Sequence, residues 1–315
     1  MKKISIITPC YNEEGNIEEL CTRIRAVMAT LPQYSYEHLF IDNHSTDGTV
    51  GKIKSLAAVD RRIKLIVNSR NFGHVRSGYY ALLQVHGDAV IIVSSDLQDP
   101  PEVFPEFLKK WEEGFKIVMA VKPTSEESLI MSTIRKSFYG IIDRISDVPL
   151  VPNATGAGLY DQSVVKILRE IDDPYPYFRG LLCEIGYPIA TIAFAQPRRK
   201  RGITKNNFYT LFELAMLGVV KHSKVPLRLM TFMGFSISLL SIFVMFIYLG
   251  LKLVYWESFS MGLAPVLIGL FFFGSVQLFF MGILGEYIGS IHTHVRKLPL
   301  VVELERVNFE QESQK

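Results

Sequence analysis

Two long stretches without a formal charge, close to the C-terminus, constrain this chain most. Between Arg228 and Lys252 lie 23 such residues, and between Glu257 and Glu286 lie another 28. At about 1.5 Å per helical residue, the shorter stretch reaches roughly 34 Å, slightly more than the roughly 30 Å hydrocarbon core of a bilayer. The sequence therefore predicts two transmembrane helices within residues 229–289. A pair of buried core helices is the alternative interpretation.

The basic residues around these stretches predict an orientation. Between Gln196 and Arg228 the chain carries eight Lys or Arg and one Glu, whereas the segment from Lys252 to Met261 carries one base and one acid. Because basic flanks stay on the cytoplasmic side, we expect both termini in the cytoplasm. The chain is then a multi-pass protein of the cell inner membrane, with its large N-terminal domain on the cytoplasmic face.

The charge pattern divides the chain into four segments. Residues 1–206 read as a catalytic domain, and residues 290–315 read as a cytoplasmic tail. In residues 207–228 the apolar positions recur at helical spacing with lysines at the ends, which predicts an interfacial helix lying on the membrane. An ordinary helix packed on the domain is the alternative interpretation there.

Composition excludes several classes of protein. Hydrophobic residues make up 49% of the chain and charged residues 21%, which argues against a disordered chain. The formal net charge is only +3, so we expect no nucleic-acid partner. Three cysteines are too few, and odd in number, for a disulfide framework.

Strand and helix signals alternate in the N-terminal part. Because apolar runs are separated by stretches with helical spacing, we expect an α/β domain with a mostly parallel sheet and helices on both faces. In such sheets ligands bind at the carboxyl ends of the strands. The runs that predict strands are Ile4–Thr8, Leu39–Ile41, Ile63–Val67, Ala89–Val93 and Ile117–Ala120.

Polar clusters follow the first four of these runs. Each cluster alone is typical of a turn or a helix cap, but four at successive strand ends favour one shared site. No G-x-G-x-x-G follows the first strand, and no G-x-x-x-x-G-K-[ST] occurs in the chain, so a dinucleotide site and a P-loop are not expected. The clusters lie at residues 8–14, 42–49, 68–74 and 94–102.

Taken together, the motifs resemble glycosyltransferase family 2, and the resemblance covers roughly residues 4–295. It implies a GT-A fold. The matching motifs are Ile7-Thr8-Pro9-Cys10-Tyr11-Asn12-Glu13, Asp42-Asn43-His44-Ser45-Thr46-Asp47-Gly48-Thr49, Asn71-Phe72-Gly73 and Ser95-Asp96-Leu97-Gln98-Asp99-Pro100-Pro101. The segment Arg199–Lys205 resembles the R-x-x-G-x-[ST]-K segment of the polyprenyl-phosphate branch. With two C-terminal spans, the chain is similar to bacterial polyprenyl-phosphate glucosyltransferases of the dolichyl-phosphate-mannose-synthase-like group.

The resemblance implies a donor site for a UDP-sugar. It assigns the uridine to four residues, Pro9, Tyr11, Glu13 and Asp42. It also assigns Gly73 to the donor site. An aromatic face and a carboxylate suit a base that stacks and donates hydrogen bonds.

The family holds a divalent cation with a D-x-D motif. Here the first acid is replaced by Ser94, while Asp96 is kept as a catalytic and metal-binding residue. Gln98 is the second expected ligand, with Asp99 as an alternative. Oxygen donors of this kind suit Mg²⁺ or Mn²⁺, which is the expected cofactor.

The acceptor implied by the resemblance is a polyprenyl phosphate. Arg199, Arg201 and Lys205 are assigned to phosphate binding, against the alternative of a basic cluster attracted to anionic lipid. The family often carries an acid in the slot that Ala157 occupies here, and that acid is the usual candidate for base or acceptor positioning. Asp161, four residues on, is not expected to substitute for it.

The expected activity is inverting transfer of glucose from UDP-glucose to undecaprenyl phosphate at the cytoplasmic membrane face. Two alternatives stay open: a polyprenyl-phosphate mannosyltransferase that uses GDP-mannose, and a catalytically silent subunit that binds lipid or nucleotide. Glycines in the predicted spans permit close helix packing, so we also expect a homo-oligomer.

Overall fold

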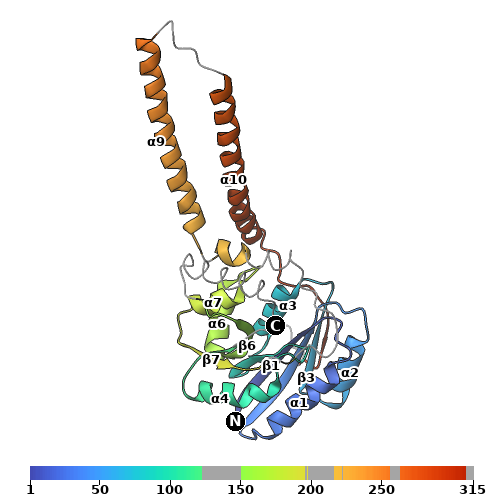
Figure 1. The fold of residues 1–315 in the computed structure, drawn as a ribbon. Coiled ribbons are helices and arrows are strands. Elements are labelled where there is room, and N and C mark those ends of the chain that lie inside the picture. The colour runs from blue at the N-terminus through green and yellow to red at the C-terminus, as the bar shows by residue number, and fades with distance from the viewer. Residues whose placement is uncertain (123–149, 196, 198–215, 222, 256–262, 310–315) are drawn as a thin grey trace.

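A computed structural model describes residues 1–122, 150–195, 197, 216–221, 223–255 and 263–309 of the chain (Figure 1). A layered α/β domain holds the N-terminus, and two long helices project from one end of it. Arg199, Arg201 and Lys205, residues 207–215 and 222 of the predicted interfacial segment, and the loop between the two long helices lie outside the described residues.

The described part of the domain contains one eight-stranded sheet, in the order β7-β5-β6-β4-β1-β2-β3-β8. Neighbours among β4, β1, β2 and β3 are parallel, while β6 is antiparallel to both β4 and β5, and β8 is antiparallel to β3. The strands are β1 (Lys2–Cys10), β2 (Tyr34–Asp42), β3 (Ile63–Asn68), β4 (Ala89–Ile92), β5 (Ile117–Val121), β6 (Ala154–Asp161), β7 (Ile189–Ala193) and β8 (Glu303–Val307). The expected mostly parallel α/β sheet is confirmed.

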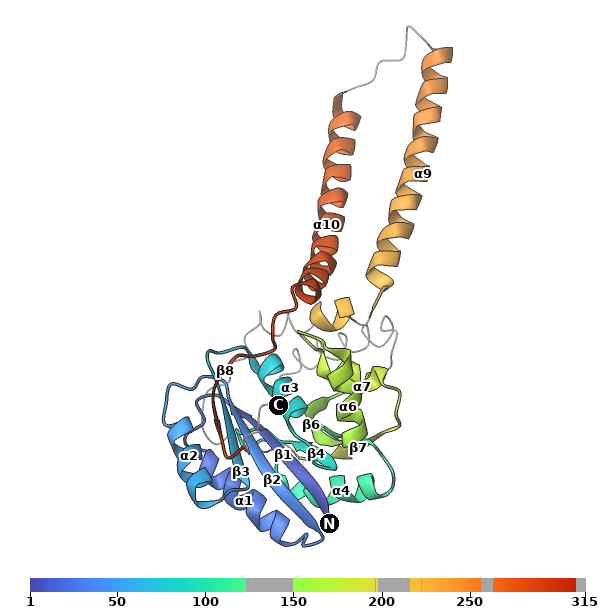
Figure 2. The ribbon, with the colours of Figure 1, turned by 180° about the vertical axis from the view of Figure 1, so that it is seen from behind.

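Helices cover both faces of this sheet (Figure 2). Alternate residues of β1 point to opposite faces: Ile4 and Ile6 join one buried cluster and Ile7 joins the other. The first cluster includes side chains of α1 (Ile17–Ala29), α2 (Thr49–Val59) and α4 (Phe104–Glu112), which follows the short helix η1 (Pro101–Val103). The second includes side chains of α3 (His74–Gln84), α6 (Gln162–Ile171) and α7 (Phe178–Glu184).

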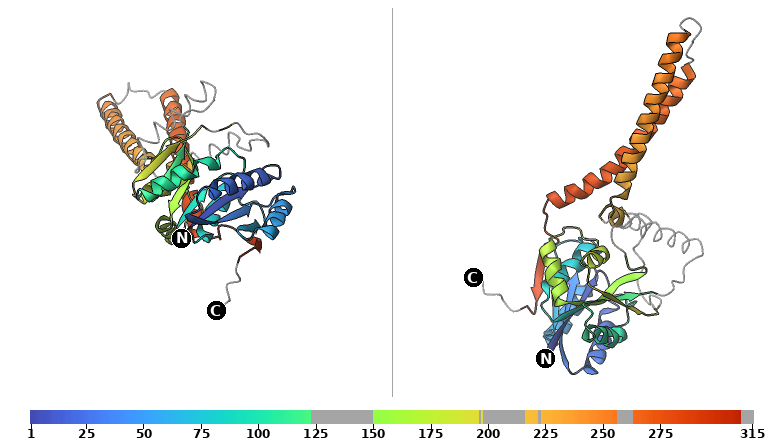
Figure 3. Two further views of the ribbon diagram at one scale, coloured as in Figure 1. Left: turned by 90° about the horizontal axis from the view of Figure 1, so that it is seen from below. Right: turned by 90° about the vertical axis from the view of Figure 1, so that its left-hand side faces the viewer.

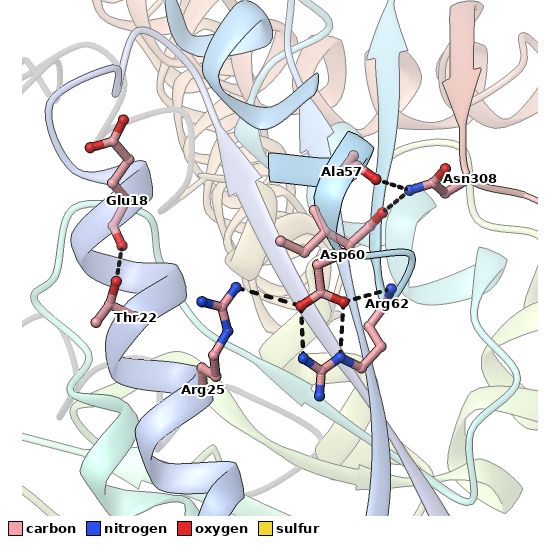
Figure 4. Close-up of polar contacts among 8 residues, drawn as sticks. Glu18, Thr22, Arg25, Ala57, Asp60, Arg62 and Asn308 are labelled. Atoms are coloured by element: carbon pink, nitrogen blue, oxygen red, sulfur yellow. Dashed lines mark hydrogen bonds and ion pairs between the residues drawn. The ribbon is translucent and has the colours of Figure 1, made fainter. Parts of the chain in front are cut away.

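The C-terminal segment returns to the domain, which the sequence did not predict. Strand β8 lies in the predicted tail 290–315, yet it extends the sheet beside β3. Asn308 donates from Nδ2 to the carbonyls of Ala57 (2.8 Å) and Ile63 (2.9 Å), and its neighbourhood is shown in Figure 4. The sheet of the catalytic domain therefore includes residues on both sides of the apolar helices.

The two projecting helices are α9 (Val225–Val254) and α10 (Leu263–Val295). Both are long and apolar enough to cross a membrane, and their apolar windows are not buried inside the protein (Figure 3). Since large apolar side chains remain exposed along both helices, the interpretation as buried core helices is wrong. Helix α10 extends beyond the uncharged stretch to Val295, and Tyr287 on it donates from its hydroxyl to the carbonyl of Ser223 (2.8 Å).

Candidate active site

Strand register brings the polar clusters to one edge of the sheet. Cys10 lies opposite Asp42, Asp42 lies opposite Val67, and Ile7 lies opposite Ile92. The loops after β1, β2, β3 and β4 therefore emerge side by side, as parallel strands require. This edge faces the end of the domain from which α9 and α10 project.

The first two loops are joined by direct hydrogen bonds. Asn12, with a φ of 55°, donates from its backbone N–H to Ser45 Oγ (2.8 Å) and accepts from the backbone N–H of Thr46 (2.8 Å). Asp42 is fully buried and accepts from the backbone N–H of Ser45 (2.8 Å) and from its hydroxyl. These contacts give the two loops one fixed shape.

Glu13 stabilises the same pair of loops. Its side chain is buried and accepts from Asn16 Nδ2 (2.6 Å), while its backbone N–H donates to Thr49 Oγ1 (2.9 Å). Glu13 and Asp42 are thus both buried in the two loops that these hydrogen bonds join. Their assignment to uridine stays a prediction.

An asparagine network fixes the third loop. Asn43 accepts at Oδ1 from the backbone N–H of Phe72 (2.9 Å) and donates to Asn71 Oδ1 (2.8 Å), which also accepts from the backbone N–H of Gly73 (2.8 Å). Gly73 has a φ of 86°, a conformation that favours glycine. This turn begins α3 and places its first residue, His74, at the cleft described below.

The loop after β4 holds two carboxylates around one hydroxyl. Ser94 Oγ lies 2.8 Å from Asp96 Oδ1 and 2.6 Å from Asp99 Oδ2, and the backbone N–H of Gln98 donates to Asp96 Oδ1 (3.0 Å). Asp99 Oδ1 is buried and has no hydrogen-bond partner among the described residues. Burial and, second, the nearby Asp96 raise the pKa of Asp99. The loop therefore contains carboxylate oxygens that could bind a metal ion, and one of them has no hydrogen-bond partner among the described residues.

A cavity of about 490 Å³ lies at this edge of the sheet. Its walls come from β1, α3, the loop after β4, the start of β6 and the segment that begins α7. The residues of this cleft that matter for its chemistry are Pro9, His74, Asp96, Asp99, Ala157 and Arg179.

Ala157, which the family resemblance places in the slot of an acid, lines this cleft. Its side chain is 6% exposed and belongs to the apolar core. Asp161 lies at the other end of β6: it pairs with Ala89, at the start of β4, whereas Gly158 pairs with Ile92, at its end. Asp161 instead caps α6, accepting from the backbone N–H of Ser163 (2.8 Å), and it accepts from Trp111 Nε1 (2.8 Å). Asp161 therefore does not replace the missing acid.

One cleft residue, Arg179, was not found by sequence reasoning. Arg179 is half-buried and donates to the carbonyl of Thr155 (3.3 Å). It follows no predicted strand in a recognisable motif, and only the packing of α7 brings it to the cleft. His74 ends the predicted polar cluster at residues 68–74, but sequence reasoning assigned it no individual role. Its ring is partly exposed, but enclosure by the cleft wall and, second, the Arg179 guanidinium lower its pKa.

The oxygen atoms that line the cleft are of the kind that a hard divalent cation prefers as ligands. Within the part of the chain that the structure describes, no three His, Cys, Asp or Glu side chains gather as a metal site. Asp96 and Asp99 supply two carboxylates, and Ser94 supplies a hydroxyl between them. These oxygens fit Mg²⁺ or Mn²⁺ when further ligands come from a bound diphosphate.

Fold and cleft together define an α/β ligand-binding domain with acidic and basic side chains at the carboxyl edge of its sheet, joined to two apolar helices. Residues 5–167 match the model of the family described as "Glycosyl transferase family 2". The chain belongs to this family.

Relatives extend the likeness over nearly the whole chain. An uncharacterized glycosyltransferase of Synechocystis sp. is 33% identical over 95% of this chain and 93% of its own length. The bactoprenol glucosyl transferase of Shigella phage SfII is 30% identical over 94% of this chain and 96% of its own length. The similarity therefore includes the apolar helices and is not confined to the family domain.

Solved structures with a similar fold are more distant. A mannosyltransferase from Pyrobaculum calidifontis, in complex with GDP-Man and Mn²⁺, is 16% identical, with a TM-score of 0.47, over 93% of this chain and 87% of its own. Glucosyl-3-phosphoglycerate synthase from Mycobacterium tuberculosis is 18% identical, with a TM-score of 0.47, over 70% of this chain and 76% of its own.

Proposed function

We propose that this protein transfers glucose from UDP-glucose to a polyprenyl phosphate, with inversion at the anomeric carbon. The observation that carries the proposal is the similarity to bactoprenol glucosyl transferases over nearly the full length, apolar helices included. The acidic loop at the carboxyl edge supports it, because its carboxylates suit a divalent cation that would neutralise the diphosphate leaving group. Undecaprenyl phosphate is the acceptor we expect.

The reaction itself needs little from the protein beyond positioning. An oxygen of the acceptor phosphate forms a bond to the anomeric carbon, the bond from that carbon to the diphosphate breaks, and UDP leaves with the electron pair. A lipid phosphate is already ionised near neutral pH, so the demand for a general base is modest. The loops of Tyr11, Glu13 and Asp42 hold the uridine in this proposal, and Gly73 shapes the turn beside it.

A divalent cation, Mg²⁺ or Mn²⁺, completes the donor site in this proposal. Asp96 is its principal protein ligand. Asp99, through its position beside Ser94, and Gln98 are the further candidates. When bound, the metal neutralises the diphosphate and so makes UDP a better leaving group.

The location follows from the apolar helices and the charge pattern. We propose that α9 and α10 cross the cell inner membrane with the catalytic domain in the cytoplasm, and that the protein forms a homo-oligomer. Arg199, Arg201 and Lys205 contribute to phosphate binding near the membrane surface in this proposal. Measurement of mass in a mild detergent tests the oligomer, and a monomer alone would contradict it.

One specific observation keeps a second function in view. Ser94 and Ala157 stand where the family resemblance implies acids, which favours a subunit that binds nucleotide or lipid without catalysis. Binding of UDP without transfer from any donor would support that alternative.

The test is a transfer assay with the purified full chain. The protein in nanodiscs is incubated with undecaprenyl phosphate, Mn²⁺ and one of UDP-glucose, UDP-GlcNAc or GDP-mannose, and the lipid product is weighed by mass spectrometry. We expect a hexosyl product from UDP-glucose that is lost when undecaprenol replaces the phosphate. Preference for GDP-mannose would overturn the choice of donor.

A further inference from the structure

Arg179 is a cation in the cleft without a carboxylate partner among the described residues. Its guanidinium has five N–H donors, yet its contact within this part of the chain is one hydrogen bond of 3.3 Å to the carbonyl of Thr155. Thr155 begins the turn that leads to Ala157, and both residues line the cleft. A half-buried, unneutralised guanidinium is the protein group best suited to bind a phosphate through two parallel hydrogen bonds.

Arg179 shares the cleft with two carboxylates, those of Asp96 and Asp99. Two carboxylates alone repel a phosphate that approaches them. Arg179 and Asp99 both lie close enough to Tyr160 to act in opposite directions on its buried hydroxyl, which donates to the carbonyl of Gly156 (3.3 Å). Arg179 therefore brings to this cleft the positive charge that a phosphate ligand needs.

A second cavity lies against the apolar helix α10. This juxtamembrane cavity has about 550 Å³. Its walls come from Tyr175, from residues within 216–221 and from the C-terminal part of α10. They combine apolar or small residues with polar ones, namely Leu217, Val220, Gly285 and Gly289 with Lys221, Glu286, Ser290, Thr293 and His294. The apolar and small side chains offer contacts to an isoprenoid chain, and the polar ones lie where its headgroup end would be.

The short segment Tyr175–Arg179 separates the two cavities. Tyr175 lines the juxtamembrane cavity, and the next four residues line the cleft. The ring of Tyr177 lies against Gly218, where an added Cβ would be 3.4 Å from it. The short segment that carries Arg179 therefore contributes side chains to both cavities.

A buried ion pair holds this segment in place. Lys221 donates to both oxygens of Asp173 (2.7 and 2.6 Å), and both side chains are more than nine-tenths buried. His294 Nε2, at the end of α10, lies 3.4 Å from Asp173 Oδ1. Lys221 is thus neutralised by Asp173, whereas Arg179 makes no ion pair with a carboxylate among the described residues.

We propose that Arg179 binds the phosphate of the lipid acceptor, while the first isoprenoid units occupy the juxtamembrane cavity. The inference rests on the proposed function and names the acceptor-binding residue of that site. The donor diphosphate is the other source of phosphate, but it is expected across the cleft, at the loop of Ser94, Asp96 and Asp99.

The test compares Arg179→Gln, Arg179→Lys and the matched surface control Arg61→Gln in the full chain. Binding to nanodiscs that contain undecaprenyl phosphate, undecaprenol or phosphatidylglycerol is measured beside the affinity for UDP with Mn²⁺. We expect Arg179→Gln to weaken the selective binding of undecaprenyl phosphate by about 10- to 100-fold, the range typical for losing one charged partner. The KM for undecaprenyl phosphate should rise by a similar factor. Arg179→Lys should recover part of the loss, and UDP affinity should stay within about twofold, since the proposal leaves the donor contacts intact.

Each other outcome has a defined meaning. Loss of UDP affinity with intact lipid binding would assign Arg179 to the donor diphosphate, and unchanged affinity for both ligands would assign it to neither; either result overturns the inference. Thermal unfolding of Arg179→Gln, measured beside Arg179→Lys and the exposed control Arg61→Gln, shows whether a loss of binding is a loss of fold. If the wild-type chain forms no glycolipid but still binds undecaprenyl phosphate through Arg179, the proposed function fails and the inference stands.

Discussion

Ser94 Oγ lies 2.6 Å from Asp99 Oδ2, so the serine in the slot of a family acid contacts the next carboxylate along the loop. The same oxygen is 2.8 Å from Asp96 Oδ1. One hydroxyl carries one proton and donates to one acceptor at a time, so one carboxylate always lacks this donor. A metal ion bound to Asp96 removes that shortage, which is why this loop is the best candidate for the cation.

The first prediction concerns this loop. Asp96→Asn should lower transfer by about 10²–10³-fold, as losing one preorganised charge-stabilising group typically does, and should weaken Mn²⁺ binding in the presence of UDP. Ser94→Ala should cost less, while Ser94→Asp should tighten Mn²⁺ binding because it restores a carboxylate. Electron paramagnetic resonance of Mn²⁺ gives the affinities independently of turnover. Full activity of Asp96→Asn in excess chelator would show that the metal assignment is wrong.

The second prediction concerns acid stability and rests on His38. This residue is buried in β2, its Nε2 lies 2.9 Å from Thr8 Oγ1, and burial lowers its pKa to about 3. Because the unfolded chain takes up this proton near pH 6.5 and the folded chain does not, stability falls as the pH decreases from 6.5 towards 3. At pH 5 the loss is about 2 kcal/mol relative to pH 7.

The measurement is chemical unfolding in detergent at pH 7 and pH 5, compared between the wild type and His38→Gln. Glutamine does not titrate, so the variant should lose less stability between the two pH values, even if it is less stable at both. An identical pH dependence in the two proteins would show that His38 does not cause the acid sensitivity.

The third prediction concerns strand β8. Asn308 has a φ of 61° and donates to two carbonyls, those of Ala57 and Ile63. Asn308→Ala removes both hydrogen bonds and places alanine in a left-handed conformation, so we expect a loss of about 1–3 kcal/mol in unfolding free energy. Asn308→Gly removes the bonds without the strain and should lose less.

Thermal and chemical unfolding of the full chain measure both variants. The matched control is Glu305→Gln, which breaks an exposed ion pair with Lys54 (2.6 Å) and should change stability by no more than about 1 kcal/mol. If Asn308→Ala is as stable as the wild type, β8 is not an integral strand of the domain.

The sheet shows where sequence reasoning succeeds and where it ends. Strands β1 to β5 were predicted because each contains an apolar run that is buried in the sheet. Strand β6 was missed because Gly156, Ala157 and Gly158 interrupt its pattern; Gly158 is required by close packing, since an added Cβ would lie 2.2 Å from the carbonyl of Val118. Strand β8 was missed because its charged residues are stabilised by partners on β3 and α2, far away in sequence.

The candidate site divides in a similar way. The loops after the parallel strands were predicted to converge because the carboxyl ends of such strands share an edge, and the register of β1, β2 and β4 places these strand ends side by side. Asp96 lines the cleft, whereas Asp42 is buried and is not among its lining residues. Arg179 was not found, because its place at the cleft depends on how α7 packs after β6. A basic residue within an ordinary amphipathic segment carries no local signal of such a role.

The fourth prediction concerns orientation in the membrane. Single cysteines are introduced at Ser258, between the apolar helices, and at Ser313, near the C-terminus. The native Cys10 and Cys21 are buried, and Cys183, which is half-buried, is replaced by Ser in the background. Because the basic residues before α9 favour the cytoplasm, a membrane-impermeant reagent should label position 258 in intact cells but not position 313. Labelling of position 313 alone, or of both positions, contradicts the proposed orientation.

The last prediction concerns Ala157, which lines the cleft with Asp99 and Thr155 but presents only a methyl group. If acceptor positioning in this family needs an acid in this slot, Ala157→Asp should raise the rate of transfer from UDP-glucose to a short polyprenyl phosphate by about 10²–10⁴-fold, the usual contribution of a general base. A carboxyl at this nearly buried position beside Asp99 also costs stability, so the assay is run below the unfolding temperature of each variant.

Ala157→Asn is the matched control: it has the size and polarity of the aspartate without its charge and should not raise the rate. An unchanged or lower rate for Ala157→Asp, while UDP still binds, means that the acceptor phosphate attacks without a base and that this chain needs no acid at position 157.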